Sequence, residues 1–180
     1  MQITGRILGI LWAIGYLAED KYTFFYIRHK NKSIIEEIRQ FFNIKSKIIE
    51  GESFTGKQYK LKITSTTKDL IMKELLNQGW TPRNSSARYY PKNLQPDQHK
   101  DFIFTWIEIH SSFDYHGCGK GKQRLRVYGN KTFIEELNQH IHRIFGCGIK
   151  KPQITVKGTN TYALYYQNKH EVECLLERKL

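Results

Sequence analysis

The stretch FIFTWIEIHSSF, residues Phe102–Phe113, resembles a stretch 96 positions earlier, RILGILWAIGYL, residues Arg6–Leu17. Each is an apolar run of helical length that passes into a strand-like end. A second matched pair follows, NKSIIEE at Asn31–Glu37 and NKTFIEE at Asn130–Glu136, at an offset of 99. The three extra residues are best placed in the glycine-rich turn CGKGK at Cys118–Lys122, because turns tolerate insertions. The two halves of the chain are therefore internal repeats of one another.

Each repeat predicts the same elements: a helix, a strand pair, a second helix, a second strand pair and a closing helix. The expected fold class is α+β, with two pseudo-symmetric αββαββα halves. The first half is expected to span residues 1–80 and the second residues 101–180. Residues 81–100 hold three of the four prolines and are expected to form a connector. Both second helices are expected to open with a capping box, Ser33 with Glu36 and Thr132 with Glu135.

The charge balance is strongly basic. Lysine and arginine number 29 against 17 acidic residues, which gives a formal net charge of +12. Such an excess is typical of proteins that bind a polyanion, most commonly nucleic acid. No membrane partner is expected, because no helix pairs a basic face with a clean apolar face and the apolar run Ile7–Leu17 is too short to span a bilayer. Three cysteines without a secretory signal predict a cytoplasmic or other intracellular protein with free thiols.

Several predicted strands alternate apolar residues with basic and polar ones. In QYKLKIT, residues Gln58–Thr64, Lys60 and Lys62 share one face while Leu61 and Ile63 share the other. This period is typical of an antiparallel sheet with one face on the core and one in water. The wet face carries residue types that contact phosphates and base edges. The residues expected to bind DNA are Arg28, Gln58, Lys60, Lys62, Lys120, Lys122, Arg124, Arg126, Tyr128, Gln153, Thr155 and Lys157.

The segment QPDQHKDFIFTWIEIHSSFD, residues Gln95–Asp114, resembles the motif region of the LAGLIDADG homing endonucleases. Phe102 and Ile103 match this region. Glu108 falls on the first acid of the motif and His110 on its last acid, which is the metal ligand in that family. The resemblance covers nearly the whole chain, as a single-chain protein with two motif copies.

In the first copy, Trp12 and Ile14 hold the two acid positions, and Gly9 matches the interior glycine that allows close helix packing. The resemblance implies that the two motif helices pack together at the centre of the molecule. It also implies two saddle-shaped sheets that grip DNA, and acids at the ends of the motif helices that bind a divalent metal.

The chain departs from the motif at the acids themselves. Cleavage of a phosphodiester with Mg²⁺ needs hard oxygen ligands. Ile14 cannot bind a metal and His110 is a poor ligand for Mg²⁺, so no metal and no other cofactor is expected. We expect His110 to serve as a phosphate contact instead.

A rival register remains open. If the first motif is moved by six residues, AIGYLAEDK at Ala13–Lys21 becomes the motif copy and Asp20 the metal acid. The second copy would then end in Asp114 and His116. One retained acid is expected to support nicking at most.

The hypothesis that follows is a monomeric protein that binds duplex DNA with sequence specificity, has lost cleavage and acts as a regulator. One alternative is an active, Mg²⁺-dependent, site-specific endonuclease that uses Asp20 or Glu108. Another is an RNA-binding helper of intron splicing, a role that some members of the family have.

Overall fold

Each half of the chain follows the order αββαββα in the computed structural model, which describes residues 3–18, 24–54, 56–81, 88–116, 122–155 and 157–177. The first half contains α1 (Gly5–Ile14), β1 (Gly15–Ala18), β2 (Phe24–His29), α2 (Lys32–Phe41), β3 (Ile49–Ser53), β4 (Gly56–Ile63) and α3 (Ser65–Asn77). The second half contains α4 (Gln98–His110), β5 (Ser111–His116), β6 (Lys122–Gly129), α5 (Lys131–Phe145), β7 (Gln153–Ile154), β8 (Tyr162–Tyr166) and α6 (Lys169–Leu176). The predicted α+β class and the repeated order are confirmed.

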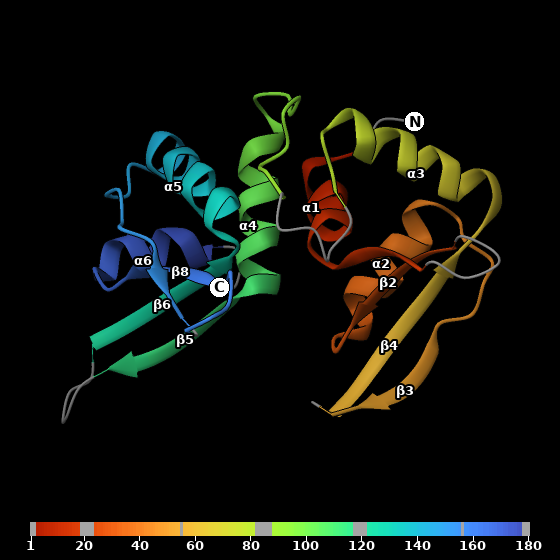
Figure 1. Cartoon of the computed structure of the whole chain (residues 1–180), viewed down its shortest axis with the longest axis horizontal. Helices are drawn as coiled ribbons and strands as arrows, with labels where there is room; N and C mark the ends of the chain where they lie inside the picture. The colour runs from red at the N-terminus through yellow and green to blue at the C-terminus, as the bar shows by residue number, and fades with distance from the viewer. Residues whose placement is uncertain are drawn as a thin grey trace.

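The strands form two four-stranded antiparallel sheets, one in each half. The N-terminal sheet has the order β1-β2-β4-β3 and the C-terminal sheet the order β5-β6-β8-β7, so both have one topology. Figure 1 shows α1 and α4 side by side at the centre, with the two sheets diverging below them to either side. The helices α2 and α3 lie with the first sheet, and α5 and α6 with the second. The molecule therefore has two similar wings joined by a central helix pair.

The central helices α1 and α4 run in the same direction. Near their first turns, Nε2 of Gln98 donates a hydrogen bond to the main-chain oxygen of Ile3 at 2.9 Å. At their last turns, Nε2 of His110 donates to the main-chain oxygen of Ala13 at 3.2 Å. Contacts at both ends hold the pair together along its length.

A glycine allows these helices to approach closely. A Cβ atom added at Gly9 would lie 2.8 Å from the Cβ of Thr105, closer than real side chains approach. Thr105 is the residue that the 96-position offset pairs with Gly9. The helices also end at equivalent residues, Ile14 and His110. The predicted central packing of the motif helices is thus confirmed.

One hydrophobic core runs through both wings. Residues that alternate along the inner strands are fully buried, including Phe25 and Ile27 in β2 and Leu125 and Val127 in β6. The residues between them are partly or fully exposed. Each wing therefore uses the period of two that the sequence indicates, with burial of each large side chain worth about 1.5–3 kcal/mol.

The predicted capping boxes are wrong. The N-cap of α2 is Asn31, whose side chain accepts a hydrogen bond from the main-chain N–H of Ser33. The N-cap of α5 is Asn130, whose side chain accepts from the N–H of Phe133. Asparagine is among the strongest N-cap residues and comes first in both copies, so the helices begin two residues earlier than a Ser33 or Thr132 cap would allow.

Two predicted boundaries also differ from the structure. The strand β7 contains only Gln153–Ile154, although the expected DNA contacts Thr155 and Lys157 imply a longer strand. The pairing with β8 continues for one more residue, because both the N–H and the hydroxyl of Thr155 donate to the main-chain oxygen of Thr161. The helix α4 begins at Gln98, inside the expected connector.

Strand pairing refines the alignment of the two repeats. Gly15 pairs with Ile27 in the first half, and Ser111 pairs with Val127 in the second. Equivalent residues are therefore 96 positions apart on the first strands and 100 apart on the second strands. The first turn of the second half is longer by four residues rather than three. Lys30 has no counterpart before the next helix.

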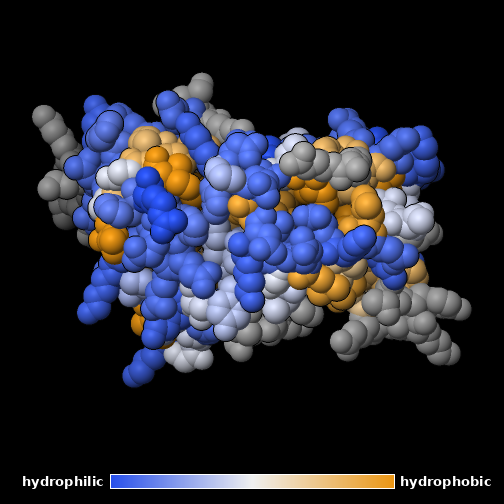
Figure 2. All heavy atoms as spheres, turned by 90° about the horizontal axis from the view of Figure 1, so that it is seen from above, coloured by the Kyte–Doolittle hydropathy of each residue, from blue (hydrophilic) through white to orange (hydrophobic). Residues whose placement is uncertain are grey.

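The surface on the side away from the sheets is mostly hydrophilic, with apolar patches between the charged residues (Figure 2). The exposed apolar side chains of α3 are Leu70 and Leu76. Within the ranges described above, no helix has both the length and the apolar character needed to cross a membrane.

Candidate nucleic-acid interface

Each sheet has one face on the core and one face in water, which we call its open face. On the N-terminal sheet the open face carries four of the expected DNA contacts, Arg28 from β2 and Gln58, Lys60 and Lys62 from β4. Arg28 lies directly opposite Lys60, and Tyr26 opposite Lys62. The two glutamates of β3 pair with residues of the other face. Along the described parts of β1–β4, this open face therefore carries cations and no carboxylate.

The cations of this face lie over aromatic rings. Nζ of Lys60 is 3.8 Å from the ring centre of Tyr26, and Nζ of Lys62 is 3.2 Å from that of Phe24. The ring of Tyr16 stacks on that of Tyr26 at 5.6 Å. A ring holds an ammonium group in place but leaves its net charge intact. These lysines therefore remain able to attract phosphates.

The open face of the C-terminal sheet is built differently. Asp114 in β5 lies directly opposite Arg124 in β6 and accepts hydrogen bonds from its Nε and Nη2, both at 2.9 Å. Asp114 also accepts from Nη2 of Arg126 at 2.5 Å. The hydrogen bond with Asp114 raises the pKa of Arg124 above its ordinary value. Two of the expected DNA contacts thus share one carboxylate, which the sequence analysis considered only as an acid of the rival register.

The hydroxyl of Tyr128 is also engaged on this face. It forms a 2.8 Å hydrogen bond with the hydroxyl of Ser112 on the neighbouring strand. Gln153 is exposed in β7, opposite Ala163, at the edge of the sheet.

Two further expected contacts lie just beyond the end of β7. Thr155 and Lys157 follow β7 in a turn, and Lys157 is exposed. Lys120 lies outside the described residues. Lys122 opens β6, but its side chain is not described. The described contacts of the C-terminal half therefore gather on β6 and β7.

The C-terminal ends of α1 and α4, which we call the foot of the helix pair, hold the two positions of the expected metal acids. Ile14 is only 3 % exposed there. His110 donates to the carbonyl of Ala13, and its ring lies 4.4 Å from the ring of Trp106. The foot is therefore closed by apolar packing and by a hydrogen bond between the helices.

Glu108, the acid in the middle of the apolar stretch, forms an ion pair with Arg6. Nη1 of Arg6 donates to Glu108 at 2.6 Å, while its Nε and Nη2 donate to Glu37 of α2 at 2.7 and 2.9 Å. Burial alone would lower the pKa of Arg6, but the hydrogen bonds with Glu37 and Glu108 raise it above its ordinary value. The equivalent pair across the crossing is Trp12 with Phe102, in edge-to-face contact at 6.2 Å.

Arg88 was not expected to have a structural role. This residue comes from the expected connector, yet it is only 6 % exposed. Its Nη1 donates to the main-chain oxygen of Trp12 at 2.9 Å and its Nη2 to that of Thr81 at 3.2 Å. A cation at a helix C-terminus complements the helix dipole and the carbonyls that the helix leaves unpaired. Nothing in the local sequence distinguishes Arg88 from a solvated loop arginine.

Solved structures with the same arrangement of helices and sheets exist. One is the homing endonuclease I-GzeII in complex with its DNA target, at 14 % identity, with 98 % of this chain and 84 % of that chain covered and a TM-score of 0.58. Another is a variant of I-DmoI with its target DNA in the presence of Mg, at 13 % identity, with 96 % of this chain and 92 % of that chain covered and a TM-score of 0.60. A third is I-SmaMI bound to uncleavable DNA, at 12 % identity, with 96 % of this chain and 83 % of that chain covered and a TM-score of 0.61. The fold is that of the LAGLIDADG homing endonucleases. No family model and no curated protein matches the chain.

The LAGLIDADG fold implies a divalent metal at the foot, and the residues of this chain do not fit one. Ile14 supplies no ligand atom, and Nε2 of His110 is already a donor to a carbonyl oxygen. The carboxylate of Glu108 is paired with Arg6, and Arg88 adds a further cation close to the end of α1. Within the described residues no three His, Cys, Asp or Glu side chains come together as a metal site. A hard cation would meet too few oxygen ligands here and too much positive charge.

The structure also bears on the rival register of the LAGLIDADG motif. Its first copy, residues 13–21, contains only the last two residues of α1, and Gly15–Ala18 is a strand. A motif helix does not span this segment. Asp20 lies outside the described residues, the side chain of His116 is not described, and Asp114 is the partner of two arginines.

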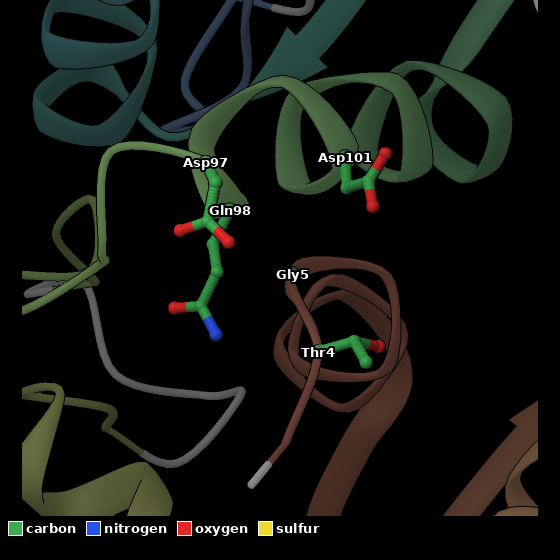
Figure 3. A pocket seen from close by; sticks show the side chains of 5 residues that line it. All are labelled: Thr4, Gly5, Asp97, Gln98 and Asp101. Atoms are coloured by element: carbon green, nitrogen blue, oxygen red, sulfur yellow. The ribbon is translucent and has the colours of Figure 1, made fainter.

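A hollow of about 240 Å³ lies at the opposite end of the helix pair from the foot. Figure 3 shows Asp97, Gln98 and Asp101 at the start of α4, facing Thr4 and Gly5 at the start of α1. Carboxylates at this place complement the positive ends of the helix dipoles. In the LAGLIDADG fold this is the end of the motif helices farthest from the acid positions, and favourable charge–dipole interaction accounts for the two carboxylates.

Proposed function

We propose that this protein binds duplex DNA across the open faces of its two sheets and does not cleave the DNA at the foot of the helix pair. The observation that carries the proposal is the open face of the N-terminal sheet, where Arg28, Lys60 and Lys62 line neighbouring strands without a carboxylate. A net charge of +12 and the DNA complexes of proteins with the same fold support it.

The geometry of a sheet suits this partner. Side chains on one face of a strand recur about every 7 Å, roughly two base steps, and a strand ribbon fits the major groove of B-DNA. Two wings of one topology suit a long target with imperfect two-fold symmetry. Since both motif helices are present in one chain, a monomer is sufficient to form the central pair.

The chemistry of the foot supports binding without cleavage. The foot offers no pair of oxygen ligands from the two helices, and Ile14, His110, Arg88 and the Arg6–Glu108 pair all serve to hold the helices together. A protein that occupies a specific site without cutting it would act as a regulator, such as a repressor.

The first test is the salt dependence of binding to a labelled random duplex. A protein that neutralises about six phosphates should lose about a thousandfold in affinity between 50 and 200 mM salt. Lys62→Gln should weaken binding and flatten the slope. Lys73→Gln, the same charge change on an exposed position of α3, should leave both unchanged. A flat response, or displacement of the duplex by structured RNA at equal concentration, would overturn the proposal.

A further inference from the structure

We propose that the two sheets divide the work of recognition. The C-terminal sheet specifies the DNA sequence through guanine contacts made by Arg124 and Arg126, which Asp114 holds in place. The N-terminal sheet supplies affinity that tolerates any sequence. This inference rests on the proposed DNA binding and deepens it by naming the half of the protein, and the residues, that specify the target.

The first argument comes from equivalent positions of the two repeats. The offsets fixed by strand pairing place Phe24 and Tyr26 at the positions of Arg124 and Arg126. They likewise place Ala18 at the position of Asp114. One fold therefore presents an aromatic pair on one open face and an arginine pair with its own carboxylate on the other.

The second argument is the geometry of the Arg124–Asp114–Arg126 cluster. Asp114 accepts hydrogen bonds from Nε and Nη2 of Arg124 and from Nη2 of Arg126. Each guanidinium has five N–H donors, so these contacts leave Nη1 and one hydrogen of Nη2 on each arginine, and on Arg126 the buried Nε–H as well. Those Nη donors form the fork that recognises O6 and N7 of guanine in the major groove.

A shared carboxylate has two physical effects on this fork. It fixes the arginine side chains before DNA arrives, so less side-chain entropy is lost on binding. It also repels phosphates, which makes non-specific backbone contacts by the same arginines less favourable. Asp114 therefore lowers the affinity for DNA of any sequence and increases the discrimination between base pairs. Its oxygens can also accept a hydrogen bond from the N4 amino group of cytosine.

The N-terminal sheet lacks both effects. Lys60 and Lys62 are point charges on flexible stems that rest on aromatic rings. Arg28 is exposed on the same face, 6.0 Å from the ring centre of Tyr16, and the described strands of this face offer no carboxylate to fix its fork. An ammonium group has no planar fork and moves on a flexible stem, so it contacts phosphates readily and discriminates between bases less sharply than a fixed guanidinium. This sheet is therefore suited to anchoring the protein on DNA of any sequence.

The experiment starts from duplexes that the wild-type protein recovers from a random library. We expect G·C pairs to be enriched in one half of the recovered site and the other half to be degenerate. Replacing those guanines one at a time by 7-deazaguanine removes only the N7 acceptor. It should cost about tenfold in affinity at the guanines that the fork contacts.

Variants then assign that half to the C-terminal sheet. Asp114→Asn should lower the penalty of 7-deazaguanine and leave affinity for random duplex equal or higher. Arg126→Met should abolish the penalty at the guanine that Arg126 contacts and retain the penalty at the guanine that Arg124 contacts. Glu50→Gln removes one acid from an exposed ion pair off the open face and should change neither quantity. Thermal melting establishes that each variant is folded.

Two results would overturn the inference while leaving DNA binding intact. One is a recovered site with equal information in both halves. The other is an Asp114→Asn variant that keeps the full 7-deazaguanine penalty. If the wild-type protein recovers no duplex at low salt, the proposed function itself fails, and the division of labour fails with it.

Discussion

His110 of α4 donates a hydrogen bond from its Nε2 to the main-chain oxygen of Ala13 in α1, at 3.2 Å. This contact joins the two central helices at the point where the LAGLIDADG fold is expected to hold metal-binding acids. A phosphate contact was expected for His110, and that role would compete with its place between the helices. The histidine therefore links the two helices by a hydrogen bond that an ionised carboxylate, which has no proton to donate, would not make to a carbonyl oxygen.

Removal of that link should cost stability rather than DNA affinity. We expect His110→Ala to lose one hydrogen bond, worth about 1 kcal/mol, and the ring contact with Trp106. For a chain of this size the melting temperature should fall by about 2–4 °C per kcal/mol. Differential scanning calorimetry measures the fall. An unchanged melting temperature with a tenfold loss of DNA affinity would instead assign His110 to phosphate binding.

The ion pairs of Arg6 with Glu37 and Glu108 should contribute more to the free energy of unfolding than the His110 hydrogen bond does. Arg6→Met keeps the apolar stem but leaves Glu37 and Glu108 without their shared cation. Since these groups are only about one-third exposed, we expect a loss of about 1–2 kcal/mol. The matched control is Lys57→Met, which breaks the more exposed pair with Glu50. Equal effects of the two substitutions in urea unfolding would contradict the role given to Arg6.

Gly9 should tolerate no side chain at the helix crossing. Gly9→Ala places a methyl group against Thr105, and we expect overpacking to cost about 1–3 kcal/mol. Gly51→Ala on β3, where an added Cβ meets nothing within 4 Å, should be neutral within about 0.5 kcal/mol. Chemical denaturation of both variants makes the comparison, and a neutral Gly9→Ala would mean that the central pair is loosely packed.

The free energy of unfolding should fall in mild acid, because two histidines of a ring stack, His99 and His140, have lowered pKa values in the folded protein. His140 lies 4.1 Å from Tyr90 and 4.8 Å from His99, and burial together with His99 and Arg143 lowers its pKa to about 4. Burial also lowers the pKa of His99. Unfolded histidines titrate near about 6.5. Between these values the unfolded chain binds more protons than the native one, so the free energy of unfolding decreases as pH falls from about 6.5 to about 4.

Melting temperatures at several pH values across this window provide the measurement. His140→Phe keeps a ring in the stack and removes the titrating group, so its melting temperature should depend less on pH. His170→Phe, at an exposed position, should retain the wild-type dependence. The explanation fails if all three proteins lose stability in parallel.

Much of the fold could be predicted because the repeat determines it. The match of Arg6–Leu17 to Phe102–Phe113 identifies the helix pair, and the alternation around Leu61 and Leu125 identifies the core face of each sheet. Boundaries were less accurate where two local signals competed. At the start of α2 the expected cap was Ser33, whereas Asn31 caps the helix by accepting a hydrogen bond from the N–H of Ser33.

The chemistry of the site was predicted only in part. The strand pattern places Lys60, Lys62 and Arg126 on open faces, because period two is a local property. The strand pattern gives no information on which side chains form hydrogen bonds across neighbouring strands or between distant segments. The hydrogen bonds that Arg124 and Arg126 donate to Asp114 depend on the register of β5 with β6. The burial of Arg88 depends on how a connector folds back onto α1.

The most direct test of binding without cleavage is selection from a random duplex library in Mg²⁺ and, in parallel, in EDTA, followed by sizing of the recovered DNA. We expect the same long, intact, imperfectly two-fold site in both conditions. Recovery of cut or nicked ends in Mg²⁺ alone would contradict the account, because it would show that oxygen ligands for a metal are present at the foot.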